Sequence, residues 1–453
     1  MIGSAPPSQA ESPLAAATDY LYQLPRGSKG AGLARAAEFF DRLGAPQNAV
    51  RTAHVAGTAG KGSVSTFLAS ILTAHGWQVG AHLSPHVYSI RERFQVSGAP
   101  ITEGTFVELV DRIAPVVDAM MDSDLGAPTF FEVANAIAFT HFAGSSVDYS
   151  VIETGIGGLL DATNTIGRPD KFAVITRIGL DHTDMLGETE SAIARHKAGI
   201  LPQGGQGIAL RHPSREVRRT LAGAAQQRRC QLDQLDERLV SCDVSTFGTY
   251  LRIGDGKPMR LGLEGRHQGV NAALALRAAE HLSIRDGWSL DHGAARDGLA
   301  TAKLPGRFEQ RITVGGQHVV LDGAHNAVKL AALVSTLQDL YPAQRFAWVL
   351  ALKDDKDLDA ALTAVAPSAA GIVATEFHSG SDGMASGAVR SMPAGKVAER
   401  ARAAGLRAIE VGCPLEAVTI ASQVAGTAPV VISGSFLLLD AISSALTPET
   451  YTP

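Results

Sequence analysis

Three glycines, a lysine and a serine stand close together within residues 50–74 (VRTAHVAGTAGKGSVSTFLASILTA), and this combination is suited to binding a polyphosphate. The glycines let the backbone approach a phosphate without a Cβ in the way. Consecutive N–H groups, and the start of the helical pattern that follows, offer partial positive charge to an anion. Lys61 supplies a full charge, and Ser63 supplies a hydroxyl of the kind that holds Mg²⁺. The sequence therefore predicts a nucleotide-binding loop.

The spacing in this loop differs from the standard G-x-x-x-x-G-K-[ST] motif. Val55 stands where the first glycine belongs, and Gly62 separates Lys61 from Ser63. A glycine-rich turn between a strand and a helix is the alternative, but the lysine and serine favour a phosphate ligand. The residues expected to contact the nucleotide are Gly57, Thr58, Ala59, Gly60, Lys61, Gly62 and Ser63.

Polar side chains suited to binding magnesium follow several of the apolar runs. Ser84 comes after the run 78–83, Glu153 closes the run 149–153, and His182 follows a third run. Magnesium takes oxygen ligands, and open α/β sheets place their ligands at the carboxyl ends of the strands. Each residue alone is better explained as a helix-capping neighbour or a structural histidine. Their shared position at strand ends predicts a metal site.

Two further polar clusters follow glycine turns or strands. Asp161 comes shortly after the run of glycines at 155–158, although Asp after glycine also simply builds turns. Asp322 and His325 follow an apolar run near residue 320. Asp322 is a candidate acceptor of hydrogen bonds from ribose hydroxyls. His325 is a candidate for lying over a phosphate or a base. The alternative is a helix-capping turn.

The elements that position these residues alternate between strand and helix, which is typical of a mostly parallel sheet covered on both faces. The strands expected before residue 300 are 51–56, 78–83, 149–153 and 172–178. The helices expected among them include 63–75, 103–121, 129–143 and 191–199.

The alternation restarts after a change in composition at residues 302–307 (AKLPGR). The later strands are expected at 318–321, 346–352, 371–375, 408–411 and 429–432. We therefore expect a disordered tail over 1–14, a nucleotide-binding α/β domain over 15–303 and a smaller C-terminal α/β domain over 304–453. Residues 377–390 show neither the helical nor the strand periodicity of apolar residues and are expected to form a mobile loop.

Composition limits the class of protein. Hydrophobic residues make up 45% of the 453-residue chain and charged residues 19%, which is typical of a soluble globular protein. A net charge of −5 gives no sign of a nucleic-acid or membrane partner. The three cysteines of the chain share no metal-ligand spacing. No apolar run is long enough to indicate a membrane span, and no leader pattern indicates secretion. We expect a cytoplasmic enzyme.

Taken together, the motifs resemble the folylpolyglutamate synthase/dihydrofolate synthase family, a branch of the Mur ligase superfamily. The resemblance covers residues 18–440 and is carried by ten segments in family order. They are HVAGTAGKGSV (54–64), HLSPHVYSIRERF (82–94), TFFEVANAIAF (129–139), ETGIGGLLDATN (153–164), ITRIGLDHTDMLGET (175–189), IARHKAGIL (193–201), GRHQGVNAALAL (265–276), LPGRFE (304–309), LDGAHN (321–326) and SGSF (433–436).

This resemblance implies a Mur-ligase-like P-loop domain, a smaller C-terminal domain and an ATP-dependent amide ligase. In the family, a folate-type carboxylate attacks the γ-phosphate of ATP, and L-glutamate then attacks the acyl phosphate. Two Mg²⁺ sites are implied, with Ser84 and Glu153 on one or both and His182 on the second. Lys197 is similar to a lysine that the family commonly carbamylates. The family leans monomeric.

The resemblance also implies roles for single residues. It places Asn271 and Arg307 at ATP and Asp322 at the ribose, with His325 at the acyl phosphate or nucleotide. Lys61, Lys197 and His325 are thus the expected catalytic residues. The pteridine-bearing substrate is expected against Gly32, Leu33, Ala34, Arg35, Thr129, Phe130, Phe131, Leu160, Asp161 and Ala162.

The chain departs from the family pattern at several positions. Ala59 replaces an asparagine in the loop, Leu159 replaces an arginine near the folate pocket, and His196 replaces a glutamate before Lys197. Residues 326–328 also differ from the common HNPHG-type run. Leu159 and the unusual loop 377–390 motivate an alternative, a specialised ligase that joins a non-folate carboxylic acid to an amine. An idle nucleotide-binding protein and a cell-wall precursor ligase are weaker alternatives, because the charged centres and the SPHVYSIRERF segment argue against them.

Overall fold

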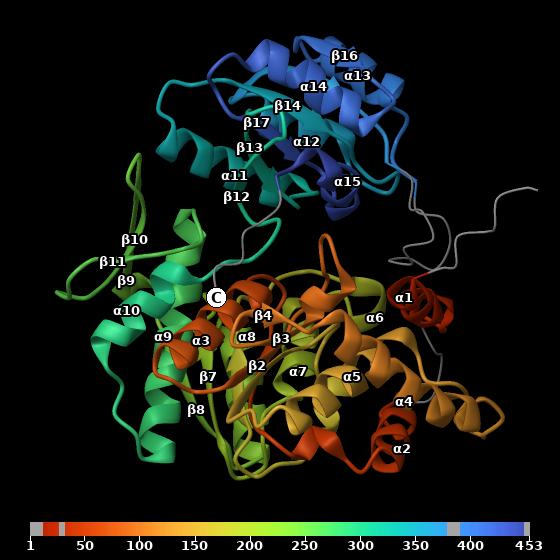
Figure 1. Ribbon diagram of the computed structural model, residues 1–453. Helices are drawn as coiled ribbons and strands as arrows, with labels where there is room; N and C mark the ends of the chain where they lie inside the picture. The colour runs from red at the N-terminus through yellow and green to blue at the C-terminus, as the bar shows by residue number, and fades with distance from the viewer. Residues whose placement is uncertain (1–11, 27–31, 378–389, 448–453) are drawn as a thin grey trace, which may run out of the picture.

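The computed structural model describes residues 12–26, 32–377 and 390–447. Figure 1 shows two lobes, an N-terminal lobe coloured red to green and a C-terminal lobe coloured cyan to blue. Each lobe is built on its own mostly parallel sheet, with helices on both faces. The fold class expected from the sequence is therefore confirmed.

The N-terminal lobe contains an eight-stranded sheet of order β4-β3-β2-β5-β1-β6-β7-β8. Its strands are β1 (Arg51–Ala56), β2 (Val79–His82), β3 (Phe94–Val96), β4 (Ala99–Pro100), β5 (Tyr149–Glu153), β6 (Phe172–Ile175), β7 (Gln206–Leu210) and β8 (Gln231–Leu235). The six strands from β2 to β8 pair in parallel, while β3 and β4 form an antiparallel edge. Strands β1 and β5 are therefore central, and their carboxyl ends carry the glycine loop and Glu153.

Successive side chains of each strand point to opposite faces of this sheet, and a different set of helices covers each face. They are α1 (Pro13–Gln23), α2 (Ala34–Arg42), α3 (Lys61–Ala74), α4 (Glu103–Met121), α5 (Phe130–Gly144), α6 (Thr183–Leu186), α7 (Glu190–Ala198), α8 (Arg215–Gln227), α9 (Arg266–Asp286) and α10 (His292–Thr301). Val55 on β1 packs toward α3, α9 and α10, whereas the next residue, Ala56, packs toward α7 and α8. The remaining part of that second face is covered by α1, α2, α4 and α5. The two-residue period of the strands thus fixes which helix covers which face.

The C-terminal lobe contains a six-stranded sheet of order β12-β13-β17-β14-β15-β16. The strands are β12 (Glu309–Ile312), β13 (His318–Asp322), β14 (Phe346–Leu350), β15 (Ala369–Ala374), β16 (Ala408–Glu410) and β17 (Val430–Ser433), and the helices are α11 (Ala327–Leu340), α12 (Leu358–Val365), α13 (Ala394–Ala403), α14 (Pro414–Ala425) and α15 (Phe436–Ala441). Only β12 pairs antiparallel, against β13.

A third sheet was not expected from the sequence. Strands β9 (Val240–Ser245), β10 (Gly248–Ile253) and β11 (Met259–Arg260) form a small antiparallel sheet that packs on α9. Strand β9 alternates partly buried and exposed side chains over most of its length and β11 has only two residues, so these strands lack the continuous apolar run that identified the parallel strands. Leu251 joins the core of the N-terminal lobe, while Val244 packs against the core of the C-terminal lobe.

Other boundaries differ in small ways from expectation. Residues 12–14 were expected in the disordered tail, but Ser12 caps helix α1 and Pro13 is its first residue, because Ser-Pro is also a favoured helix start. Helix α3 begins at Lys61 rather than residue 63, and β6 ends at Ile175 rather than residue 178. Residues 1–11 of the expected tail, and 378–389 of the expected loop, lie outside the described residues. Among the described helices, none is both long and apolar enough to cross a membrane.

A buried ion pair fixes α2 against α5, near the predicted substrate residues. Arg35 Nε donates to Glu132 Oε2 at 2.8 Å and Arg35 Nη2 to Glu132 Oε1 at 3.1 Å. Both side chains are 6% exposed. Glu132 also accepts hydrogen bonds from the backbone N–H and the hydroxyl of Thr129, which completes a capping box at the start of α5.

We predict that Glu132→Ala lowers the free energy of unfolding by about 3–5 kcal/mol, because it removes one partner of a buried ion pair. A urea titration of the N-terminal lobe's unfolding transition measures this change. Glu38→Ala, which breaks the exposed Arg42–Glu38 pair, is the matched control and should cost less than about 1 kcal/mol. Equal losses in the two variants would contradict the structural role of the Arg35–Glu132 pair.

Candidate active site

The loop between β1 and α3 is held tightly against the segment that follows β6. Thr58 N–H donates to the carbonyl of Arg177 at 2.8 Å, and the Thr176 hydroxyl donates to the carbonyl of Ala59 at 2.8 Å. A Cβ on Gly57 would lie 1.7 Å from Thr176 Oγ1, so only glycine fits there. The loop backbone is therefore preorganised, and its amide groups precede the N-terminus of α3, where an anion is favoured.

Asn271 lies against the same loop, as the resemblance implied. Gly60 adopts a left-handed conformation with φ of 87°, and a Cβ there would lie 2.5 Å from Asn271 Oδ1. The amide of Asn271 is oriented by Gln268, whose Oε1 accepts from Nδ2 at 2.9 Å. Helix α9 thus brings a polar side chain to the nucleotide loop from a segment about 210 residues later in the chain.

Glu153 is a buried carboxylate at the carboxyl end of β5, beside the start of α3. A Cβ on Gly62 would lie 3.5 Å from Glu153 Oε2, and the same oxygen accepts the N–H of Ser84 at 2.9 Å. Burial raises the pKa of Glu153, while the charge of Lys61 and the Ser84 N–H oppose that rise. Two of the three predicted metal ligands, Ser84 and Glu153, are therefore adjacent.

His182, the third predicted metal ligand, is not part of a preformed cluster. It is exposed, has a φ of 48°, and its Nε2 lies 3.7 Å from a carboxylate oxygen of Asp181. Among the described residues, His, Cys, Asp and Glu side chains form no group of three that could hold a metal ion. Glu153 and Ser84 nevertheless supply oxygen donors of the kind that Mg²⁺ takes together with substrate phosphates.

Arg307 brings positive charge to this place from the connection between the lobes. Its guanidinium stacks 4.5 Å from the centre of the Phe436 ring. Burial lowers the pKa of Arg307, and the negative charges of Asp322 and Glu153 act in the opposite direction. A cation carried by residues 302–308 therefore lies near the acidic group of each lobe.

Asp322 holds the turn that carries Arg307. Its Oδ2 accepts the N–H of Phe308 and its Oδ1 accepts the N–H of Ala324, both at 2.8 Å. Asp322 therefore orders the turn before α11 without capping the helix, since the N-cap of α11 is Asn326, and contact with a ribose stays a prediction. Burial raises the pKa of Asp322, with Arg307 as the main opposing charge.

The neighbours of His325 define its tautomer. Its Nδ1 lies 2.8 Å from the carbonyl oxygen of Gly323, and its Nε2 lies 3.2 Å from Nζ of Lys329. A carbonyl only accepts and an ammonium only donates, so Nδ1 carries the proton and Nε2 is the acceptor. Burial, followed by the charge of Lys329, lowers the pKa of His325 to about 4, so the ring is neutral near pH 7.

Lys329 was not among the site residues expected from the sequence. Burial and the positive charge of Arg307 lower its pKa, and Asp181 and Lys61 of the other lobe also act on it. The first turn of α11 thus faces the nucleotide loop. A signal was present in the sequence, because Lys329 follows His325 by four residues and lies on the same face of a helix start.

Lys197 is a buried amine on α7, with an exposed fraction of 3%. Burial and then the charge of Lys61 lower its pKa to about 8, while Asp181 and Asp161 act in the opposite direction. The lysine therefore lies in the same electrostatic environment as the nucleotide loop.

The predicted substrate residues differ in what they can offer a ligand. Phe130 is buried and stacks with Tyr22 at 5.8 Å, with the guanidinium of Arg26 at 4.8 Å from its ring. Phe131 is only partly buried and packs over Gly155, where a Cβ would lie 2.7 Å from its ring. Phe131 is therefore the aromatic side chain that is more accessible to a ligand.

The substrate residues of the other two segments are also placed. Asp161 is buried and accepts the N–H groups of Ile156 and Thr163, each at 3.0 Å, so it fixes the glycine turn. Leu160, beside it, is 61% exposed. Gly32 adopts a positive φ of 52° just before α2, which carries Arg35.

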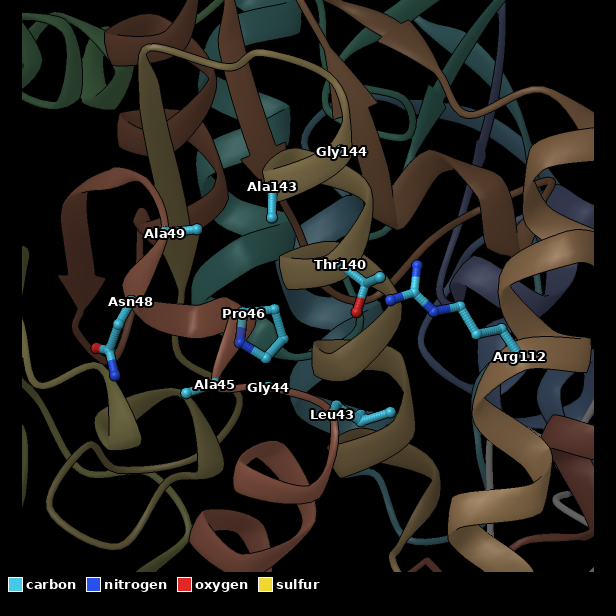
Figure 2. Close-up of a pocket in the computed structure, with 10 residues that line it drawn as sticks. All are labelled: Leu43, Gly44, Ala45, Pro46, Asn48, Ala49, Arg112, Thr140, Ala143 and Gly144. Carbon is cyan, nitrogen blue, oxygen red and sulfur yellow. The ribbon is translucent and has the colours of Figure 1, made fainter.

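One hollow in the described part of the chain lies away from these residues. It has a volume of about 460 Å³ and lies between the loop after α2, the end of α5 and Arg112 of α4 (Figure 2). Figure 2 shows Arg112 and Thr140 pointing toward each other across it. The lining contains none of the predicted catalytic, nucleotide, metal or substrate residues. The candidate site is therefore defined by the convergence of charged side chains at the lobe junction, and not by this hollow.

Comparison with known proteins decides the family. Residues 306–436 match the family model of the Mur ligase glutamate ligase domain. A dihydrofolate synthase/folylpolyglutamate synthase of Bacillus subtilis is 35% identical over 335 residues, which cover 72% of this chain and 76% of that protein. The chain belongs to the folylpolyglutamate synthase/dihydrofolate synthase family. The family predicted from the ten segments is confirmed.

Solved structures of this family agree over nearly the whole chain. A Mycobacterium tuberculosis folylpolyglutamate synthase complexed with ADP has a TM-score of 0.81 and 29% identity, covering 95% of this chain and 98% of that one. An Escherichia coli FolC in complex with DHPP and ADP has a TM-score of 0.76 and 28% identity, covering 96% and 98%. As a member of the folylpolyglutamate synthase family, the chain is an enzyme, an ATP-dependent glutamate ligase.

Two departures from the folylpolyglutamate synthase pattern are accommodated by backbone contacts. Ala59 contributes its carbonyl to Thr176 and its N–H to Arg177, so the turn forms without a side-chain amide. Leu159 N–H donates to the carbonyl of His196 at 2.7 Å, which attaches the glycine turn to α7. These substitutions leave the nucleotide loop and the Lys197 helix in place.

We predict that Lys61→Ala lowers turnover at least about a hundredfold, because the lysine is the charged group of the nucleotide loop. Release of phosphate from ATP in the presence of both acceptor and glutamate measures the effect. Lys303→Ala, which removes a lysine that is exposed and unpaired among the described residues, is the control. Undiminished turnover in Lys61→Ala would remove this loop from the mechanism.

Proposed function

We propose that the chain joins L-glutamate to the carboxylate of tetrahydrofolate, of dihydropteroate or of both, through an acyl phosphate, with release of ADP and phosphate. The observation that carries this proposal is the convergence of Lys61, Glu153, Arg307 and His325 from two lobes at one place, in a chain of this family. The relative solved with ADP and DHPP supports the acceptor class.

The nucleotide is held mainly by groups that are already oriented. The amides of the 57–60 loop and the start of α3 face the phosphates, and Lys61 adds a full charge. Arg307 approaches from the lobe connection and stabilises the charge that develops when the carboxylate attacks. Because the loop amides and Arg307 are placed by backbone contacts, they need no rearrangement at the moment of reaction.

Magnesium would be held by Glu153 and Ser84, with His182 at a second position. Glu153 is suited to this role because it is a buried oxygen donor oriented by the Ser84 N–H and adjacent to Lys61. Bound Mg²⁺ neutralises charge on the phosphates during transfer. Burial favours the protonated form of Glu153, and the charge of Lys61 opposes this effect. A bound metal ion would add further positive charge, so the ion and the carboxylate would stabilise each other.

Lys329 would stabilise the acyl phosphate from the C-terminal lobe, and His325 would orient the Lys329 ammonium through Nε2. The neutral His325 ring presents Nε2 next to the Lys329 ammonium, and Lys329 lies near enough to Lys61 for the two charges to interact. A phosphate between these lysines would relieve their repulsion. Asp322 would contact the ribose beside the same turn.

Lys197 has the acid–base property that carbamate formation needs. Carbon dioxide reacts with a neutral amine, and with a pKa of about 8 the amine is about one quarter neutral at pH 7.5. A lysine with an ordinary pKa would be neutral only about one time in a thousand. The carbamate would replace a buried cation by an anion that faces Lys61.

We predict that removing dissolved carbon dioxide lowers activity and that carbon dioxide held at one dissolved concentration restores it, with faster restoration as the pH rises toward 8. Below that pH the neutral amine falls about tenfold per pH unit, so restoration should slow accordingly. Lys197→Ala should be weakly active and partly restored by a short-chain carboxylate. Wild-type activity of this variant without any additive would exclude the carbamate.

We predict that ATP hydrolysis depends on both substrates. A panel of dihydropteroate, tetrahydrofolate and its one-carbon derivatives, each with glutamate, should release phosphate with at least one acceptor and not with glutamate alone. Mass spectrometry of the product should show one added glutamate. If no pteroate or folate supports turnover while another carboxylic acid does, the specialised ligase would replace this assignment.

We also propose that the enzyme is a monomer of the cytoplasm, with its domain boundary between residues 303 and 304. The candidate site is built from one chain, and its two lobes meet at the connection 302–308. Light scattering of the purified protein tests the oligomeric state.

A further inference from the structure

The loop that carries Ser84 also reaches into the C-terminal lobe. Val87 is 3% exposed and belongs to the apolar cluster that contains Leu321 of β13 and Leu437 of α15. Tyr88 packs against the same cluster. Three successive N–H groups of this loop, those of Val87, Tyr88 and Ser89, donate to the carboxylate of Glu92 at 2.7–2.8 Å, so its shape is fixed.

The hydroxyl of Tyr88 donates to the carboxylate of Glu309, which also binds the backbone of the connection between the lobes. Tyr88 Oη donates to Glu309 Oε2 at 2.9 Å, and the same oxygen accepts the N–H of Gly306 at 2.8 Å. Arg311 pairs with the other oxygen at 3.0 Å, and the Glu309 side chain is 10% exposed. Glu309 therefore holds the turn at Gly306 from within the C-terminal lobe, and Tyr88 reaches it from the other lobe.

Both ends of this contact lead directly to residues of the proposed reaction. On one side, Ser84 lies four residues before Tyr88 and donates its N–H to Glu153. On the other side, Gly306 precedes Arg307, and the carbonyl of Gly306 accepts the N–H of Gly323 at 2.9 Å beside Asp322. Three hydrogen bonds lie on the path from Glu153 to Arg307: Ser84 N–H to Glu153, Tyr88 Oη to Glu309, and Gly306 N–H to Glu309. The backbone joins Ser84 to Tyr88 and Gly306 to Arg307.

We propose that Tyr88 and Glu309 are positioning residues that set Arg307 relative to the Ser84–Glu153 pair. The inference rests on the proposed function, because it assigns Arg307 and Glu153 to the same reaction centre. Neither Tyr88 nor Glu309 touches the reacting atoms. Their bond couples the turn that carries the arginine to the loop that carries a metal ligand, so that the two lobes present their charges in one arrangement.

The test compares two tyrosines that lose the same hydroxyl. Tyr88→Phe removes the bond between the lobes and keeps the ring in its apolar contacts. Tyr341→Phe is the matched control, because Tyr341 Oη donates to Gln310 Oε1 at 3.0 Å, next to Glu309 on β12 but within one lobe. Steady-state kinetics and amide hydrogen exchange of peptides over 84–93 and 304–312 are measured for wild type and both variants.

We expect Tyr88→Phe to lower kcat about tenfold or more with a smaller change in the KM for ATP, because a misplaced charge acts mainly on the transition state. Exchange in both peptides should rise in this variant and stay at the wild-type level in Tyr341→Phe, which should also keep its kcat. Glu309→Gln combined with Tyr88→Phe should lower kcat by less than the product of the two single effects.

Three results would overturn the inference. They are an unchanged kcat in Tyr88→Phe, a lowered kcat without faster exchange in either peptide, and equal effects in Tyr341→Phe. If wild type itself shows no turnover with any folate or pteroate, the proposed function fails. The hydrogen exchange of the substrate-free protein then still reports whether Tyr88 holds the Gly306 turn.

Discussion

Moving the carboxylate of Glu153 out of water costs free energy that only nearby positive charge and N–H donors can offset. The donors come from different parts of the chain: Lys61 begins α3, Ser84 follows β2, and Arg307 lies in the connection between the lobes. A buried charge is stable only when its partners are held close to it. Glu153 therefore restricts the positions of the ends of β2 and β5, the start of α3 and the connection that carries Arg307. The site and the lobe arrangement therefore depend on the same electrostatic balance.

The C-terminal lobe repeats this arrangement with Asp322. Its carboxylate is held by two backbone N–H groups of adjacent turns and lies near Arg307. Arg307 thus interacts with an acidic group on each side, and its position is a compromise between the lobes. An anionic substrate entering between Lys61 and Lys329 would add negative charge where the two lobes otherwise present positive charge. This arrangement of charges is electrostatically complementary to a polyphosphate.

Sequence and structure agree best where a single segment contains the whole signal. Strands β1 and β5 and helix α4 have the bounds expected from local pattern, because continuous apolar strands and capped amphipathic helices are determined by neighbouring residues. Agreement was poorer for β9–β11, whose half-exposed short strands resemble loops in sequence. Tyr88 and Lys329 were given no role, since their importance arises from partners in the other lobe or one helical turn away.

The sequence by itself determined the family, the two α/β units and the chemical types at the site, because ordered motifs with fixed spacing depend only on the order of residues. Only the tertiary structure decided that Glu153 is buried beside Lys61, that Phe131 rather than Phe130 is accessible, and that His325 is neutral with its proton on Nδ1. Those properties depend on solvent exclusion and on charges that are far apart in the chain. They come into existence only when the two sheets and their connection bring those charges together.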